Sequence, residues 1–336
     1  MSIAKKVNNL ILGGSYENLT QFAITAFQNQ LLLEETSKES LDSVITSTIP
    51  KKVTIEQPVV ESSSLLSTNF IPEQVKTVLP PENSKIPNDC LWGQYNRIFP
   101  IKITLRVLAN LLKENETVDL SILQSNAVQS ARVIGLALKK EDKKNRRKYG
   151  EMLSSALPIG RNLSKTENRF INHFVGYYTR AGRIEGAPGA LKLLNIFEEN
   201  NGSYQVGITQ TGLGFATLRN PILDEENYSL TLSQQESSFY IKNIFDNLKR
   251  EAQLTVEILK AVKDGKSSPS DLNDAISHFS RGWSQAMINT IRAGAVSRLH
   301  ELGLLGRLRR GIRVLYSLSE FGKETLDNFM KLKGEY

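Results

Sequence analysis

Near the C-terminus the spacing of apolar residues changes from helical to alternating. A helical pattern ends at Gly303, where a residue without Cβ can adopt a left-handed cap conformation. A basic turn follows at 309–311, and residues 313–318 then alternate with period two, as expected of a strand. Ser319 is placed to cap a last helix that carries Leu326 on its apolar face. The pattern therefore predicts helix, strand, basic turn, strand and helix.

Helical spacing also predicts the segments that precede this region. Two helices are expected at Gln234–Asn247 and Lys249–Val262. The run Ser268–Asp271 is expected to open a further helix that carries Leu272, Ala275 and Ile276. A third helix is expected from about Trp283 to Leu302. We interpret residues 227–336 as one domain.

The middle of the chain shows a second series of apolar patterns. Trp92, Tyr95 and Ile98 are interpreted as core anchors rather than as a platform for stacking bases, because they lead directly into an apolar helix at 101–112. A second helix is expected at 120–138. These elements open a domain that we place at 89–226.

This middle domain ends in a pattern that recurs later in the chain. A helix is predicted to close at Leu191–Phe197, followed by a turn at 200–202 and a strand at Tyr204–Ile208. The residues Ile208-Thr209-x-x-Gly212 then match Leu318-Ser319-x-x-Gly322, which lie 110 residues further on. In both places a hydroxyl residue would cap a helix directly after a strand. The match is short, so chance is the alternative to an internal duplication; the helices before each copy favour two similar domains.

The N-terminal part differs from the rest in composition. Residues 1–35 contain two short amphipathic helices and are interpreted as a helical hairpin. Residues 36–88 contain scattered prolines and serine runs without sustained periodicity, which is typical of a disordered linker. Two short apolar patches within it, 53–60 and 65–78, are the parts able to dock transiently on a core.

Composition and charge favour a polyanion partner. The 336-residue chain has a formal net charge of +7 and a pI near 9.3. Residues 1–90 contain 7 basic and 10 acidic side chains. Residues 91–226 contain 19 basic and 13 acidic side chains, and residues 227–336 contain 16 basic and 12 acidic ones, so the basic excess lies in the last two thirds of the chain. The single cysteine, Cys90, fits a reducing compartment. Because no apolar run approaches the length of a membrane span and no signal peptide is evident, we expect a cytoplasmic protein without membrane contact.

The C-terminal pattern resembles the winged-helix domain of MarR-like regulators over roughly the last 85 residues. The resemblance rests on Leu-x-x-Leu-Gly-Leu, the basic turn and Leu-Ser-x-x-Gly. It implies that the helix before Gly303 reads double-stranded DNA and that the hairpin is a basic wing. This helix is longer than the resemblance leads us to expect, so it is either unusually long or broken near Gly294. The implied DNA contacts are Arg281, Gln285, Asn289, Arg292 and Arg298 on the helix and Arg307, Arg309, Arg310 and Arg313 on the wing.

The N-terminal helices are similar to the second half of ribbon-helix-helix proteins, in the segment from Gly13 to Glu35. That resemblance implies an intertwined homodimer held by Leu19, Phe22, Ala26 and Phe27. Few residues precede the first helix, so dimerisation is favoured over base contact. The alternative is a helical hairpin that docks on the rest of the chain or on a protein partner.

Further basic residues lie in the middle domain. The ten residues Lys139–Lys148 contain seven cations and two acids, which indicates either a solvated basic loop or a site of phosphate contact. We retain Lys143, Lys144, Arg146, Arg147 and Lys148 from this run, together with Arg180, Arg183 and Lys192 near the candidate reading helix of the middle domain, as candidate DNA contacts.

Catalytic motifs find little support in the sequence. His173, His278 and His300 are far apart and belong to no metal-ligand pattern, and neither a Walker loop nor a nucleophile elbow is present. We therefore expect no enzyme, no metal and no cofactor.

The predicted fold is mainly α with small β-wings, as tandem winged-helix domains plus an N-terminal helical hairpin on a flexible tether. The function expected is a dimeric DNA-binding transcriptional regulator; the alternative is a non-catalytic DNA-binding or protein-interaction subunit of a larger nucleoprotein or defence-type complex.

Overall fold

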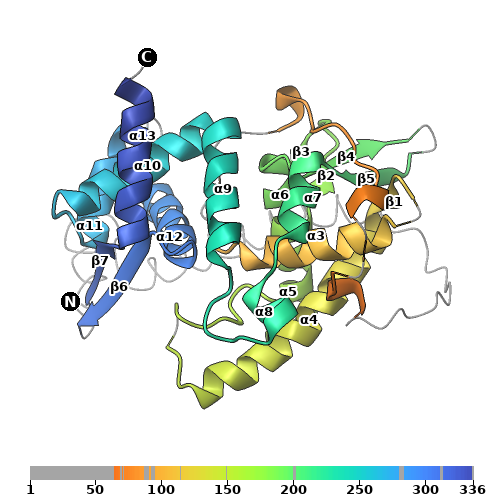
Figure 1. The fold of residues 1–336 in the computed structure, drawn as a ribbon, viewed down its shortest axis with the longest axis horizontal. Helices are drawn as coiled ribbons and strands as arrows, with labels where there is room; N and C mark the ends of the chain where they lie inside the picture. The colour runs from red at the N-terminus through yellow and green to blue at the C-terminus, as the bar shows by residue number, and fades with distance from the viewer. Residues whose placement is uncertain are drawn as a thin grey trace, which may run out of the picture. The chain divides into compact units, whose positions relative to one another are not determined.

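The computed structural model describes residues 64–68, 70, 72–86, 91, 95–113, 115–148, 150–199, 202–279, 284–310 and 313–334. The chain divides into two units, 1–58 and 59–336, and all described residues belong to the second. The predicted hairpin at 1–35, which contains the proposed dimerisation residues, lies outside the described residues. Trp92 and Arg281 lie outside them as well. The described part is mainly helical with small antiparallel sheets, which confirms the coarse fold class (Figure 1).

The described elements fall into two halves along the chain. The first half is preceded by three short 3-10 turns, η1 Ser64–Leu66, η2 Pro72–Gln74 and η3 Asn83–Lys85. It contains α3 Phe99–Leu111, β1 Val118–Asp119, α4 Leu120–Lys144, α5 Leu163–Phe170, the π-helical turn η4 Ile171–Val175, β2 Tyr177–Tyr178, β3 Ile184–Glu185, α6 Ala187–Ala190, β4 Leu194–Glu198, β5 Tyr204–Ile208, α7 Gln210–Thr217 and α8 Pro221–Glu225. The second half contains α9 Gln234–Asn247, α10 Lys249–Lys263, α11 Pro269–Ile276, the 3-10 turn η5 Ser277–Phe279, α12 Gln285–Glu301, β6 Leu305–Arg310, β7 Arg313–Leu318 and α13 Glu320–Gly334.

Helix α3 forms the centre of the first half. Every residue from Phe99 to Asn110 is buried, as expected of a helix that is apolar on nearly all sides. Two of its cations, Lys102 and Arg106, are buried with it and point to the carboxyl end of α7. The last carbonyls of a helix have no partner within that helix, so buried donors from α3 can satisfy them.

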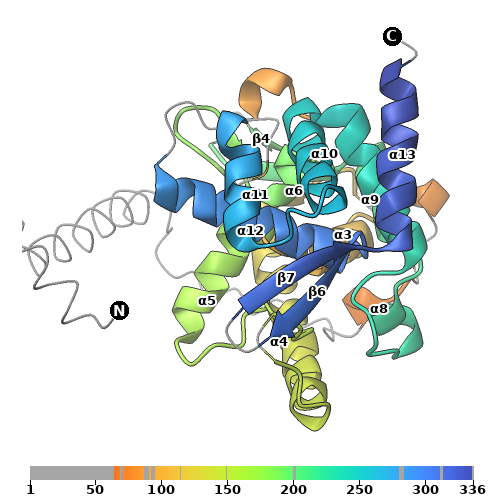
Figure 2. The same cartoon turned by 90° about the vertical axis from the view of Figure 1, so that its left-hand side faces the viewer.

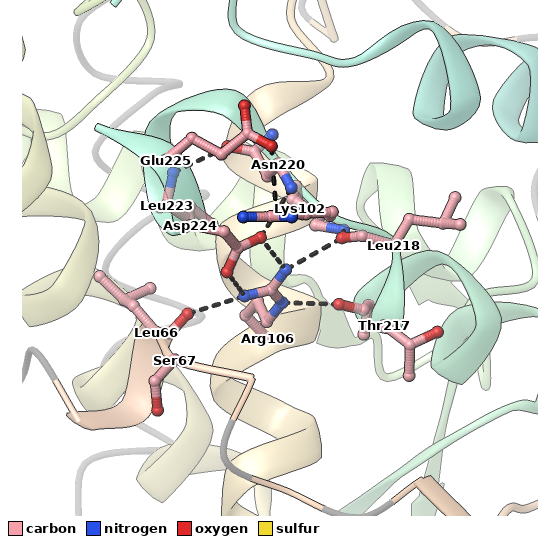
Figure 3. Close-up of polar contacts among 12 residues, drawn as sticks. Leu66, Ser67, Lys102, Arg106, Thr217, Leu218, Asn220, Leu223, Asp224 and Glu225 are labelled. Atoms are coloured by element: carbon pink, nitrogen blue, oxygen red, sulfur yellow. Dashed lines mark hydrogen bonds and ion pairs between the residues drawn. The ribbon is translucent and has the colours of Figure 1, made fainter. Parts of the chain in front are cut away.

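Arg106 makes the densest set of these contacts. Its guanidinium forms a two-pronged ion pair with Asp224, with both N–O distances at 2.8 Å, and donates to the carbonyl oxygens of Ala216 at 2.6 Å and Leu218 at 3.0 Å (Figure 3). It also donates to the carbonyl oxygen of Leu66 at 3.0 Å. The cluster therefore ties α3, α7, α8 and the segment before α3 together.

Lys102 completes the polar stripe one helical turn earlier. Its Nζ lies 2.9 Å from a carboxylate oxygen of Glu236 and donates to the carbonyl oxygens of Phe215 and Leu218, both at 2.6 Å. Burial lowers the pKa of Lys102 to about 8, although the charge of Glu236 opposes this shift. The lysine therefore stays protonated at neutral pH and pairs α3 with the start of α9.

The segment 64–86 packs on the first half, which corrects part of the predicted flexible linker at 36–88. Leu65, Leu66, Phe70 and Val75 are buried in the core. The backbone of Val78 donates to the carbonyl oxygen of Ile208 at 2.9 Å and forms a parallel bridge with Thr209. The apolar patch predicted at 65–78 is thus part of the fold, because buried apolar side chains and backbone hydrogen bonds together offset the entropy cost of ordering the chain.

A second correction concerns residues 191–197, which we expect from the sequence to close a helix; those from 194 onward lie in a strand instead. Residues 194–198 form strand β4, which pairs antiparallel with β5 from Leu194↔Ile208 to Glu198↔Tyr204, while β1 pairs with the other edge of β5. Leu194 and Ile196 are fully buried whereas Asn195 is only partly so, which is the period-two pattern of a strand. The apolar run was too short to distinguish helix from strand by periodicity alone.

The predicted sequence repeat has a geometric counterpart in the two halves. Thr209 caps α7 by accepting from the backbone N–H of Gly212 at 3.0 Å, and its hydroxyl donates to the carbonyl oxygen of Lys192 at 2.8 Å. Ser319 accepts from the backbone N–H of Gly322 at 2.9 Å, and its hydroxyl donates to the carbonyl oxygen of Gly303 at 2.6 Å. The hydroxyl groups of Thr209 and Ser319 therefore make the same two hydrogen bonds at equivalent positions of the two halves.

The backbone around the two caps also matches. Lys192 and Gly303 both have left-handed conformations, with φ of 58° and 76°. In each copy the next residue, Leu193 or Leu304, accepts a hydrogen bond from the backbone N–H of the capping residue at 3.1 Å. Strand pairing then starts at Leu194↔Ile208 in one copy and at Leu305↔Leu318 in the other. The short sequence match is thus accompanied by matching backbone contacts, so the two halves share one structural motif.

This motif predicts that the two equivalent glycines tolerate no side chain. A β-carbon on Gly212 would lie 1.8 Å from the carbonyl oxygen of Leu193, and one on Gly322 would lie 2.2 Å from that of Leu304. Gly212→Ala and Gly322→Ala should each lower the free energy of unfolding by about 1–3 kcal/mol, measured by denaturant titration. Gly214→Ala is the control, because its β-carbon would meet only the ring of Phe239, at 3.2 Å. Equal stability of all three variants would contradict this interpretation.

Candidate nucleic-acid interface

The second half orders three helices before a two-stranded hairpin. Helices α10, α11 and α12 pack through buried residues such as Ile258, Leu272 and Ile291. The helix predicted to open at Ser268–Asp271 is α11. Ser268 caps it by accepting from the backbone N–H of Asp271, whose carboxylate accepts in return from the backbone N–H of Ser268. The backbone N–H of Tyr316 donates to the carbonyl oxygen of Ser267 at 2.9 Å. This bond fixes β7 against the connection between α10 and α11.

The predicted hairpin after Gly303 forms strands β6 and β7. Their register runs from Leu305↔Leu318 to Arg310↔Arg313. Leu305 is buried at the base, whereas Arg309 and Arg313 are exposed toward the turn. Leu308 is 50% exposed between Arg307 and Arg309. Arg310 ends β6, and its side chain lies outside the described part.

Helix α12 is continuous from Gln285 to Glu301 and holds Gly294 in its buried face. It is therefore not broken there, and the 3-10 turn η5 takes up part of the extra length before it. Gln285 and Asn289 are exposed, and Oδ1 of Asn289 accepts from Nδ2 of Asn273 at 2.7 Å. Arg292 is half-buried, and its Nε donates to Oδ1 of Asn273 at 3.1 Å. The exposed face of α12 is thus more polar than cationic.

Arg298 is a correction to the predicted interface. Only 2% of the residue is exposed; its guanidinium lies 2.5 Å from a carboxylate oxygen of Glu251 and donates to the carbonyl oxygen of Tyr95 at 2.8 Å. Glu251 also accepts from the backbone N–H of Leu91 at 2.9 Å. Arg298 therefore joins α12 to α10 and to the residues before α3, and it cannot reach a nucleic acid in this structure.

Glu301 is a neighbouring contact that sequence reasoning missed. Its carboxylate accepts from the backbone N–H groups of Ile98 at 2.5 Å and Phe99 at 3.4 Å, at the start of α3. A carboxylate at this position satisfies donors that the helix leaves unpaired and interacts favourably with the helix dipole. The cap is separated from its helix by about two hundred residues, so no local pattern could indicate it.

The basic run 139–148 is largely helical rather than a loop. Helix α4 extends to Lys144, and Lys143, Lys144, Arg146 and Lys148 are exposed, with Lys144 lying 3.6 Å from Glu141. Arg147 is a second correction. It lies 3.3 Å from the buried carboxylate of Asp142 and donates to the carbonyl oxygen of Tyr228, so its role is structural.

The loop after α4 is held against the second half. Arg97 donates to the carbonyl oxygens of Gly150 at 3.3 Å and Met152 at 3.2 Å, and its guanidinium lies 4.0 Å from Glu301. A β-carbon on Gly150 would lie 2.2 Å from Nη1 of Arg307 in strand β6. Figure 1 shows α4 running from β1 toward the side on which β6 and β7 lie, and Figure 2 shows both in one view. The loop that follows the basic run of α4 thus lies beside Arg307 of the hairpin.

The remaining predicted residues lie elsewhere in the first half. Arg180 and Arg183 are exposed at the turn between β2 and β3, a hairpin that separates η4 from α6. Lys192 is half-buried, and its carbonyl accepts from Thr209. The β4–β5 hairpin corresponds to the β6–β7 hairpin, yet residues 194–208 contain no lysine or arginine. The two halves share a motif but not a basic hairpin.

The histidines do not form a common site. Burial, aided by the charge of Arg169, lowers the pKa of His173 to about 4, and its ring packs edge-on against Tyr95. His300 Nδ1 lies 2.8 Å from the carbonyl oxygen of Leu305, whereas His278 stacks on Phe279. Within the described residues, no group of three or more histidine, cysteine or acidic side chains is arranged to hold a metal ion.

None of the helices in the described part of the chain is both long enough and apolar enough to cross a membrane. No protein-family model matches this chain, and no curated protein or solved structure is significantly similar to it. The function therefore has to be inferred from geometry and charge.

Proposed function

We propose that this protein is a non-catalytic, cytoplasmic DNA-binding regulator whose second half acts as a winged-helix domain on double-stranded DNA. The observation that carries the proposal is the exposed basic hairpin β6–β7, which follows directly after helix α12 and is bonded to the connection between α10 and α11 through Ser267 and Tyr316. A hairpin that presents arginines beside a helix end is suited to phosphates or to a narrow minor groove.

In this arrangement α12 would present Gln285 and Asn289 to the major groove, because both side chains are exposed on its first turns. Amide side chains can pair with the edge of adenine, whereas the hairpin arginines would supply the sequence-independent affinity. The first half, with the same motif but a β4–β5 hairpin that carries Glu198 and Glu199 and no basic residue, would act as a scaffold or protein-binding module. Dimerisation through residues 1–35 belongs to the same proposal.

Charge removal on the hairpin tests this function. The triple variant Arg309→Gln, Arg310→Gln, Arg313→Gln should bind every duplex more weakly. Because each lost phosphate contact releases one fewer counterion, the slope of log K against log salt should fall in magnitude by about 0.9 per contact, or about 2.7 in total. Fluorescence anisotropy with labelled duplexes measures both quantities.

The matched control removes three charges elsewhere. Lys242, Lys263 and Lys323 each form a surface ion pair on α9, α10 and α13, so their replacement by glutamine changes net charge by the same amount. The control should leave the salt slope nearly unchanged. A wild-type protein that binds no duplex, or an arginine variant that behaves like the control, would reject the proposed function.

A further inference from the structure

The carboxyl end of α4 carries more exposed positive charge than interaction with the dipole of α4 explains. Lys139, Lys140, Lys143, Lys144, Arg146 and Lys148 are all exposed. Among the described residues Lys144 alone of these six forms an ion pair, with Glu141. Cations in the last turn of a helix interact favourably with its dipole, but this effect is confined to that turn and amounts to about 0.3–1 kcal/mol each. The other charges repel one another unless an anion is present.

The loop that follows is built to hold this basic end in place. The buried carboxylate of Asp142 accepts from the backbone N–H groups of Leu153 and Ser154, both at 3.0 Å, and from the hydroxyl of Ser154 at 2.6 Å. Arg147 pairs with the same carboxylate. Charged hydrogen bonds of this kind hold the loop in place, so the backbone that carries the exposed cations is tied down at Asp142.

The same loop places the basic end beside the β6–β7 hairpin. Gly150 lies against the guanidinium of Arg307, and Arg97 ties the Gly150 and Met152 carbonyls to Glu301 of α12. The Nε of Arg307 is buried and has no hydrogen-bond partner in the described part of the chain. Positive charge therefore lies on both sides of this junction, with Glu151 as an exposed acid between the α4 end and the hairpin.

We infer that the carboxyl end of α4 and the β6–β7 hairpin form one surface that binds the sugar–phosphate backbone of a single DNA duplex. This inference rests on the proposed function and extends it across the two halves. The helical part of the run, six residues at about 1.5 Å each, covers about 9 Å, and a duplex carries about one phosphate per 1.7 Å of its axis. The α4 end can thus reach several phosphates beyond those that the hairpin contacts.

The test removes charge from α4 alone. In the full-length protein, Lys143→Gln, Lys144→Gln, Lys148→Gln should reduce the magnitude of the salt slope by up to about 2.7, that is about 0.9 for each lost contact. The loss of affinity should be greater on a duplex of about 20 base pairs than on one of about 10 base pairs, because one helical turn is occupied by the hairpin and α12. The lysine triple on α9, α10 and α13 again serves as the control.

The outcomes separate the inference from the proposed function. If wild type binds duplex and the hairpin variant loses affinity while the α4 variant matches the control, the shared surface is wrong and the proposed function stands. If neither variant differs from the control, both are wrong. Preferential binding of single-stranded RNA through the α4 lysines would also overturn the inference, because those lysines would then serve a different nucleic acid. Unfolding curves that match wild type establish that each variant is folded.

Discussion

Replacing Arg106 by methionine should lower the free energy of unfolding by about 3–5 kcal/mol, the range found when one partner of a buried ion pair is removed. Methionine fills much of the same volume but donates no hydrogen bond. Asp224 would lose both guanidinium contacts, and the carbonyl oxygens of Ala216, Leu218 and Leu66 would lose their donor. Denaturant titration followed by circular dichroism measures the change.

A matched arginine is available for comparison. Arg219 forms an ion pair with Glu225 at 3.2 Å, but 73% of its side chain is exposed. Arg219→Met should therefore change the unfolding free energy by no more than about 1 kcal/mol. Pairing Arg106→Met with Asp224→Asn should recover part of the loss, because the carboxylate no longer lacks a counterion, but the carbonyls stay unpaired. Similar stabilities for the two arginine variants would show that Arg106 is not the structural link that its contacts indicate.

Arg298→Met should have a similar effect, again about 3–5 kcal/mol, because it leaves Glu251 buried without its partner. This prediction separates two roles for one residue. A base-reading arginine would alter DNA affinity and leave stability unchanged, whereas a buried structural arginine alters stability in the absence of DNA. Thermal unfolding of the free protein provides the measurement.

Arg313 supplies the crossed control, since it is exposed on β7. Arg313→Met should leave the unfolding temperature close to that of wild type and weaken duplex binding, which is the reverse of the expectation for Arg298→Met. At a temperature where both variants are folded, the Arg298 variant should retain the wild-type salt slope. An Arg298 variant with full stability and weakened DNA binding would restore the sequence-based assignment.

The sequence by itself determined the features that depend on nearby residues. Helix α9 and strand β5 have the predicted bounds, because periodicity over a few residues decides them. The caps Ser268 and Ser319 and the left-handed residue Gly303 were also predictable, since a cap bonds to a backbone only three or four positions away. The five-residue match between Thr209 and Ser319 indicated a repeated motif for the same reason.

Only the tertiary structure decided which residues are buried or paired through contacts between segments that are distant in the sequence. The sequence does not distinguish Arg298 and Arg147 from Arg309. In the structure the first two pair with buried carboxylates and donate to backbone carbonyls, whereas Arg309 is exposed. Residues 194–198 form a strand because β5 offers a partner. The segment 65–78 packs because α3 leaves an apolar surface to cover, Arg106 donates to Leu66, and Ile208 of β5 accepts from Val78. Burial and pairing depend on partners tens to hundreds of positions away, so a local pattern could locate the basic residues but could not tell which of them are exposed.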